Sequence, residues 1–125
     1  MGYQALTTNT TGSNNTAIGK DSLGTNSTAS DNTAVGYQAL TSNTTATRNV
    51  AVGYVALSSC TTGAENTAIG WAALSASTTA SANVAVGRSA LTSCTTGASN
   101  TAIGHSALAV NSTATRNTVV VPMRS

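Results

Sequence analysis

Apolar and polar residues recur along this chain with a fixed period of 17 residues. The repeated phrase is Asn, then Thr or Val, then Ala, then Ile or Val, then Gly. Its six complete copies begin at Asn15, Asn32, Asn49, Asn66, Asn83 and Asn100. A seventh copy, Asn117–Val121, keeps the spacing without the Gly, and Gly2 stands where a copy ends. A short, strict period of this kind is typical of a solenoid.

Counted from that Gly as position 1, position 5 is always Leu, position 10 Thr, position 14 Asn and position 17 Ile or Val. The period is too short for paired-helix repeats, and the Gly, Thr and Asn content opposes helix. The Thr-Ala-Ile or Val-Ala-Val segment predicts a short strand that ends in a bend at Gly, with a second strand at the Ala-Leu pair. The predicted fold is an all-β, parallel β-solenoid (β-roll) of seven 17-residue coils. Residues 2–120 form one domain, and 121–125 form a tail or cap.

Neighbouring side chains of a strand point to opposite faces. We expect the Ile or Val of position 17 to face the interior and the Ala of position 16 to face outward. An apolar stripe along a rod is typical of a contact surface. The candidate interchain contact is therefore Ala17, Ala34, Ala51, Ala68, Ala85 and Ala102.

Positions 11 and 17 change together along the chain. Gly at position 11 accompanies Ile at position 17, as in Gly12 and Ile18, whereas Ala accompanies Val, as in Ala29 and Val35. A coil that gains a methyl group at position 11 loses one at position 17, which predicts that the two side chains touch in one packed interior. Duplication of repeats in pairs explains the same pattern without contact.

The Asn of position 14 predicts a ladder of stacked amides that hydrogen-bond along the rod and to turn backbone groups. Cys60 and Cys94 share position 8 but lie two coils apart, with Ser77 between them. Their separation of roughly 9.6 Å exceeds the limit of about 7 Å between the Cα atoms of a disulfide. We expect free thiols, either inside as small fillers or outside, where they can cross-link chains.

Composition narrows the function classes. Only 6% of residues are charged, 3% are aromatic, and the net charge of +2 comes from scattered side chains. That composition is not enzyme-like, and no basic stripe indicates a nucleic-acid partner. His105 shares its column with Tyr and Arg, which indicates a surface position rather than a base or metal ligand. The sequence predicts no enzyme activity, no cofactor, no metal site and no membrane-inserting segment, and the strict period opposes disorder.

Four aromatic residues share position 2, where the residue type varies: Tyr3, Tyr37, Tyr54 and Trp71. Exposed aromatic side chains are common binding anchors, so these four are the candidate ligand contact. The alternative is that they shield the edge of the coil.

Asn15, Ala17, Ile18 and Gly19, with their equivalents in later coils, resemble the head repeats of YadA-type trimeric autotransporter adhesins and related repeats of phage tail fibres. The resemblance covers Gly2 to Val120, although the commonest repeat of that family is shorter. It implies a left-handed β-roll wound as a homotrimer, and it is the source of the number three. It also implies an extracellular place on a cell surface or virion, and a host-surface or glycan ligand.

The sequence thus predicts a structural or adhesive fibre segment that binds a surface through its repeat faces. One alternative is a self-assembling filament subunit, since uncapped solenoid ends expose strand edges. Another is an ice-binding solenoid that uses files of Thr. The position 10 file is Thr11, Thr28, Thr45, Thr62, Thr79, Thr96 and Thr113. We expect these threonines to form an inward, hydrogen-bonded ladder instead.

Overall fold

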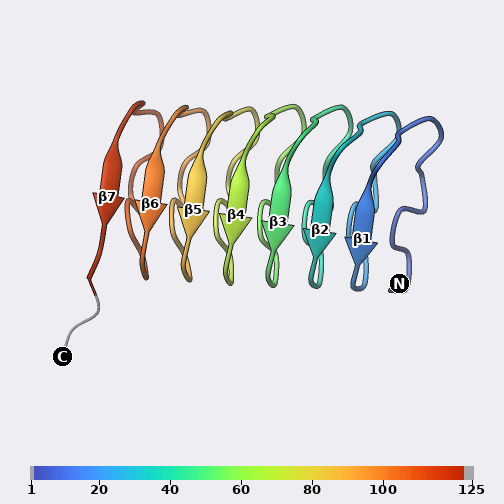
Figure 1. Cartoon of the computed structure of the whole chain (residues 1–125), viewed down its shortest axis with the longest axis horizontal. Coiled ribbons are helices and arrows are strands. Elements are labelled where there is room, and N and C mark those ends of the chain that lie inside the picture. The colour runs from blue at the N-terminus through green and yellow to red at the C-terminus, as the bar shows by residue number, and fades with distance from the viewer. Residues whose placement is uncertain (1, 123–125) are drawn as a thin grey trace.

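The computed structural model describes residues 2–122 as a rod of stacked coils that run from one end to the other in chain order (Figure 1). One wall of the rod is a seven-stranded parallel sheet whose strands follow one another in sequence. The strands are β1 (Thr16–Ile18), β2 (Thr33–Val35), β3 (Val50–Val52), β4 (Thr67–Ile69), β5 (Val84–Val86), β6 (Thr101–Ile103) and β7 (Thr118–Val120). Each residue pairs with the residue 17 positions later, as Ala17 does with Ala34. The predicted β-solenoid with one 17-residue coil per repeat is confirmed.

Each of β1 to β6 ends at a glycine that the backbone requires. Gly19 has a φ of 121°, and a Cβ there would lie 2.6 Å from the carbonyl oxygen of Gly36 in the next coil. The same conformation returns at every later Gly of this column, up to Gly104 with a φ of 117°. Only glycine combines this φ with so close a stacking.

The Ala-Leu pair does not form the predicted second strand. Leu40 has a left-handed φ of 54°, and Gln38 two residues earlier has a φ of 52°. Leu and the position 3 residue take this conformation in every coil. Because the chain turns there, Ala39 and Leu40 are both fully buried, whereas strand neighbours would point to opposite faces.

The face of each strand that we expected to point to solvent points to the interior. The central Ala of a strand is buried, at 0% exposure for Ala34 and Ala51, whereas Ile18 is 50% exposed. The fully buried Leu of position 5 fills the narrow interior, so the strand wall contributes only the small Ala side chain. The predicted interchain contact through the Ala column is wrong, because this column belongs to the core. Its members are Ala17, Ala34, Ala51, Ala68, Ala85 and Ala102.

Positions 11 and 17 do not line one interior. Ala29 is buried inside the coil, whereas Val35 lies on the outer face of the sheet. The glycine at position 11 is explained by another contact, because a Cβ at Gly63 would overlap the carbonyl oxygen of Ala80 in the next coil. The packing explanation of the paired change is therefore wrong, and duplication of repeats in pairs remains.

The predicted Asn ladder of position 14 is confirmed. The backbone N–H of Asn66 donates to Asn49 Oδ1 at 2.9 Å, and Asn66 Nδ2 donates to the carbonyl oxygen of Ala80 at 2.8 Å. Equivalent links connect this column from Asn15 to Asn117. The ladder thus joins each coil to the next from inside the rod.

Candidate binding surfaces

The outer side of the sheet carries two files of uncharged side chains along the rod. Position 15 contributes Thr or Val and position 17 contributes Ile or Val, and the in-register pairing keeps both files continuous. Exposure reaches 39% at Ile69 and Ile103 and 60% at Val120. We call this surface the strand face. It consists of Thr16, Ile18, Thr33, Val35, Val50, Val52, Thr67, Ile69, Val84, Val86, Thr101, Ile103, Thr118 and Val120.

The aromatic column of position 2 is exposed, and its rings stack on one another. The ring centroids of Tyr37 and Tyr54 are 5.1 Å apart at an interplanar angle of 12°. Those of Tyr54 and Trp71 are 6.1 Å apart at 5°. Each ring therefore covers a face of its neighbour, and the ring edges point to solvent.

Two cations extend this aromatic stack. Lys20 Nζ lies 5.9 Å from the ring centroids of both Tyr3 and Tyr37, and the Arg88 guanidinium lies 5.1 Å from that of Trp71. A ligand that stacks on an aromatic side chain needs a free ring face. The geometry therefore favours the shielding role for Tyr37, Tyr54 and Trp71, whereas Tyr3, with 71% exposure, has more free surface.

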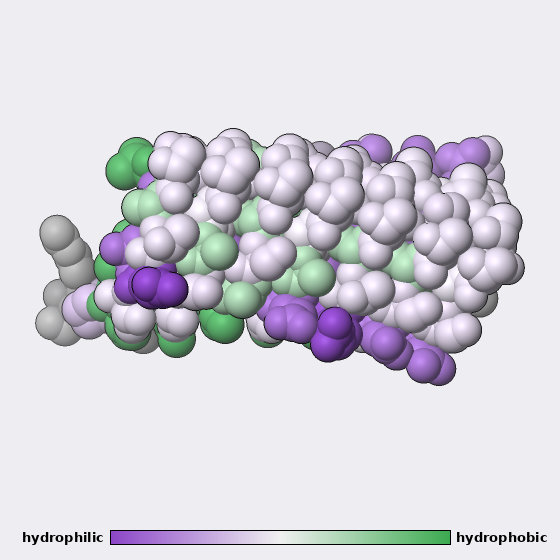
Figure 2. Space-filling model, turned by 90° about the horizontal axis from the view of Figure 1, so that it is seen from above, coloured by the Kyte–Doolittle hydropathy of each residue, from purple (hydrophilic) through white to green (hydrophobic). Residues whose placement is uncertain are grey.

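The turn side of the rod carries the threonines of positions 9 and 10. At position 9 the hydroxyl groups donate to backbone carbonyls of the next coil, as Thr44 Oγ1 does to Thr61 O at 3.1 Å. At position 10 the side chains, such as Thr62 and Thr79, are exposed, so the predicted inward ladder is wrong. Figure 2 shows a regular row of near-neutral side chains along this side, with hydrophilic side chains beside it. Arg48 and Glu65, at position 13 of consecutive coils, form an ion pair at 3.1 Å.

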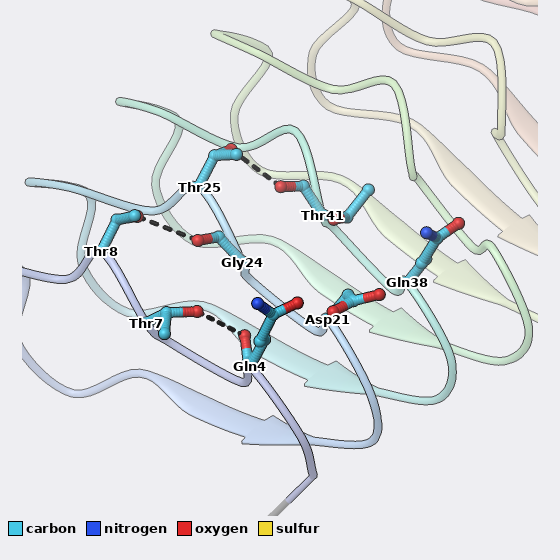
Figure 3. Close-up of a pocket in the computed structure, with 8 residues that line it drawn as sticks. All are labelled: Gln4, Thr7, Thr8, Asp21, Gly24, Thr25, Gln38 and Thr41. Atoms are coloured by element: carbon cyan, nitrogen blue, oxygen red, sulfur yellow. Dashed lines mark hydrogen bonds between the residues drawn. The ribbon is translucent and has the colours of Figure 1, made fainter.

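The second coil departs from the repeat over the stretch Lys20–Gly24, and a hollow opens there. Gly24 occupies position 6, where the preceding coil has Thr7 and the following coil has Thr41. This hollow has a volume of about 500 Å³, and Gly24 enlarges it because no side chain stands at that position. We call it the polar hollow (Figure 3). Its lining residues are Gln4, Thr7, Thr8, Asp21, Gly24, Thr25, Gln38 and Thr41.

The threonines fix the walls of the polar hollow through hydrogen bonds to backbone carbonyls. Thr8 Oγ1 donates to Gly24 O at 2.9 Å, and Thr25 Oγ1 donates to Thr41 O at 2.7 Å (Figure 3). Thr7 Oγ1 donates to the backbone of Gln4 at 2.7 Å. These side chains hold three successive coils together around Gly24.

Four other polar groups of the hollow have no such partner. Within residues 2–122, no hydrogen bond or ion pair engages the Asp21 carboxylate, the side-chain amides of Gln4 and Gln38, or the Thr41 hydroxyl. Gln4, Asp21 and Gln38 share position 3 of consecutive coils and so lie side by side along the rod. The hollow thus offers one carboxylate, two amides and one hydroxyl to a ligand.

Neither a protein-family model, nor a curated protein, nor a solved structure matches this chain. Support for a function therefore comes from the surfaces described above and from the resemblance of the repeat to YadA-type heads.

Other chemistry is sparse in the described part of the chain. Across residues 2–122, no three His, Cys, Asp or Glu side chains gather in a way that suits a metal ion. That part of the chain also forms no helix with the length and apolarity that a membrane span requires. His105 is exposed in the position 2 file. Cys60 and Cys94 are free thiols and both are buried, so of the two predicted locations the interior one is correct.

Sequence reasoning missed both the strand face and the polar hollow. The alternation of strand side chains defines two faces but does not say which one is buried. For the hollow a signal was present, because position 6 is Ser or Thr in five of the seven coils and Gly only in the second.

Proposed function

We propose that this chain is a rod-shaped segment of an extracellular structural or adhesive fibre, on a cell surface or a virion, and that copies of it associate through the strand face. The observation that carries the proposal is the strand face itself. It runs through all seven strands, contains no charged residue, and exposes 50% of Ile18 and 39% of Ile69. Position 17 of this face is Ile or Val in all seven coils, and a continuous apolar file on an outer face is typical of an interaction site.

The occupant that we assign to the strand face is a second and a third copy of the same chain. The interior of one coil is thin, because it holds little more than a Leu, a few Ala and the Asn ladder. A copy in register presents the same two files at the same spacing, so Ile and Val meet Ile and Val from coil to coil. No charges oppose this contact. The number three, and the left-handed winding that goes with it, rest on the resemblance to YadA-type heads.

Association of this kind leaves the rest of the surface free for adhesion. The aromatic column and the polar hollow follow the bend at Gly, so they lie outside the strand face. The turn side with its Thr file is also exposed. A fibre of associated rods would present these repeat faces to a host surface or a glycan.

Molar mass in solution tests this proposal. Light scattering at several concentrations should give a discrete species with three times the chain mass of 12.3 kDa. Val52→Lys places a charge on the strand face and should yield a folded monomer, with circular dichroism as the check on folding. The matched control is Thr79→Lys, which places the same charge on the exposed Thr file. A wild-type chain that stays monomeric at every concentration would overturn the association.

The ice-binding alternative is supported by one observation, the exposed Thr file of position 10. One hydroxyl-bearing side chain per coil, in register over seven coils, forms a regular array (Figure 2). If the chain is a monomer, thermal hysteresis is the next assay, and Thr62→Lys should abolish it. A series of ever larger species in light scattering would instead favour the self-assembling filament.

A further inference from the structure

We propose that the polar hollow binds a saccharide unit, with Asp21, Gln4 and Gln38 as its hydrogen-bonding groups. This inference rests on the adhesive part of the proposed function and names its ligand class. It needs only one chain, because all the lining residues come from the first three coils.

The absent side chain of Gly24 enlarges the hollow, and the backbone does not require a glycine there. Gly24 lies outside the left-handed region that the Gly19 column occupies. A Cβ on Gly24 would lie 3.2 Å from Asp21 O and 3.5 Å from Thr41 Oγ1, so a side chain fits after a small shift. The chain thus leaves open a space that neighbouring coils fill with Thr.

The free polar groups around this space match the hydrogen-bonding pattern of a sugar ring. Adjacent ring hydroxyls offer donors and acceptors together, and a carboxylate accepts from two of them while an amide both donates and accepts. Asp21 lies between Gln4 and Gln38 in the position 3 file, and the Thr41 hydroxyl lies beside Gly24 (Figure 3). A volume of about 500 Å³ is in the range of small-molecule sites.

Charge excludes two other ligand classes. Lys20 Nζ lies over the rings of Tyr3 and Tyr37, and no ion pair engages Asp21 within residues 2–122, so its carboxylate disfavours an anionic ligand. A calcium ion takes several oxygen ligands and commonly more than one carboxylate. The hollow has one carboxylate, which favours a neutral saccharide.

The walls of the hollow are already ordered before a ligand arrives. Thr8 and Thr25 hydrogen-bond to the backbone of the coil that follows each of them, at 2.9 and 2.7 Å. Binding therefore has to order only the side chains of Gln4, Gln38 and Asp21, which reduces its entropic cost.

The glutamine side chains give a direct readout. Gln4 and Gln38 are the only two glutamines of the chain, and both line the hollow. We would titrate the ¹⁵N-labelled full chain with methyl α-D-mannopyranoside, methyl β-D-galactopyranoside and N-acetyl-D-glucosamine in turn, and follow the side-chain NH₂ signals by NMR. At least one sugar should shift both pairs of signals, with a Kd of about 1 mM, as is usual for a shallow polar site.

Two pairs of variants locate the binding. Gly24→Thr places a side chain in the hollow and Asp21→Asn removes its charge, and each should weaken binding at least about tenfold. Ser58→Thr enlarges a residue of the same position 6 file in the fourth coil. Asp31→Asn repeats the charge change at another left-handed aspartate of the same coil, whose carboxylate accepts from Asn14 Nδ2 at 2.9 Å. Both controls should keep the wild-type Kd.

Three results would overturn the inference. In the first, none of the three sugars shifts the glutamine signals. In the second, a sugar shifts them equally in the wild type and in Gly24→Thr. In the third, the signals respond to CaCl₂ and to no sugar, which would indicate a cation site. Light scattering separates these failures from a failure of the fibre proposal. Gly24→Thr should keep the oligomeric mass of the wild type, and the monomeric Val52→Lys variant should still bind the sugar.

Discussion

Two files of polar side chains run through the interior of the rod, and only one of them is unbroken. Position 14 is Asn in every coil, and each Oδ1 accepts from the backbone of the next Asn. Position 8 starts in a similar way, since Asn26 Nδ2 donates to Asn9 Oδ1 at 2.8 Å and Asn43 Nδ2 to Asn26 Oδ1 at 2.9 Å. The next three residues of that file are Cys60, Ser77 and Cys94.

The two files meet at the carbonyl oxygen of position 11, which explains the difference. Gly63 O accepts from Asn49 Nδ2 at 2.9 Å and also from Cys60 Sγ at 3.1 Å. Ala80 O accepts from Asn66 Nδ2 at 2.8 Å, and the Ser77 hydroxyl between the two cysteines is buried without a partner. Position 14 therefore satisfies both this carbonyl and the backbone N–H of the next Asn in its file. Position 8 adds a second donor to a satisfied acceptor, and its Oδ1 accepts a backbone N–H only in the third and seventh coils, from Ala46 and Ala114. A file tolerates substitution where its hydrogen bonds are redundant.

The largest expected effect comes from cutting the unbroken file. Asn66→Ala leaves the buried N–H of Asn83 and the carbonyl oxygen of Ala80 without their partners. Each such group costs about 1–3 kcal/mol, so we expect a loss of about 3–5 kcal/mol in the free energy of unfolding. Urea denaturation measures it, with the exposed Thr79→Ala as control. A loss below about 1 kcal/mol would contradict the essential role of this file.

A smaller loss is expected from the interrupted file. Asn26→Ser removes its bonds to Asn9 and Asn43, but Ala29 O keeps the bond from Asn15 Nδ2 at 2.7 Å. We expect a loss of about 1–2 kcal/mol in the same urea experiment. Asn66→Ser, with the identical change in the unbroken file, should cost clearly more. Equal losses would remove the distinction between the two files.

The thiols of the interrupted file predict a pH dependence. Burial raises the pKa of the Cys60 thiol to about 11, against a smaller opposing effect of its hydrogen bond to Gly63, and burial likewise raises the pKa of Cys94. The Cys60 thiol has a higher pKa in the folded than in the unfolded protein, so the folded state is favoured by the full amount while the thiol is protonated in both states, below a pH of 9.0. This contribution to stability is lost as the pH rises from 9.0 toward 11, because the thiol then ionises in the unfolded protein first. Unfolding free energies at pH 8 and pH 10 should differ by about 1 kcal/mol more in the wild type than in Cys60→Ala. An identical difference in both proteins would show that the thiol is not desolvated.

The smallest expected effect is a gain at the unpaired hydroxyl. Ser77→Ala removes a buried group that has no hydrogen-bond partner, so stability should rise by about 0.5 kcal/mol. Ser22→Ala is the matched control, because Ser22 is also buried but its Oγ donates to Gly19 O at 2.9 Å. That variant should show no gain in thermal unfolding. A loss at Ser77 would mean that its hydroxyl has a partner in solution.

The polar hollow was only half predictable. The columns place Gln4, Asp21 and Gln38 in one file, since residues 17 apart stack in a solenoid. They do not show that the backbone at Gly24 has an ordinary conformation. Only that observation tells a glycine that leaves space open from a glycine that a turn requires. The aromatic column behaves similarly, because its common file is visible in the sequence and the stacking of Tyr37 on Tyr54 only in the structure.

The sequence by itself determined the period, the solenoid, the glycine bends and the Asn ladder. The bends depend on a local backbone preference of glycine, and the other features follow from residues that recur every 17 positions and therefore stack on one another. Only the tertiary structure decided which face of the strand is buried. Alternation is symmetric, and the larger Ile18 looks like the better core residue than Ala17. Leu23 turns inward in a left-handed conformation and fills the core together with the small Ala side chains of the strands, so the Ile and Val side chains lie on the outer face.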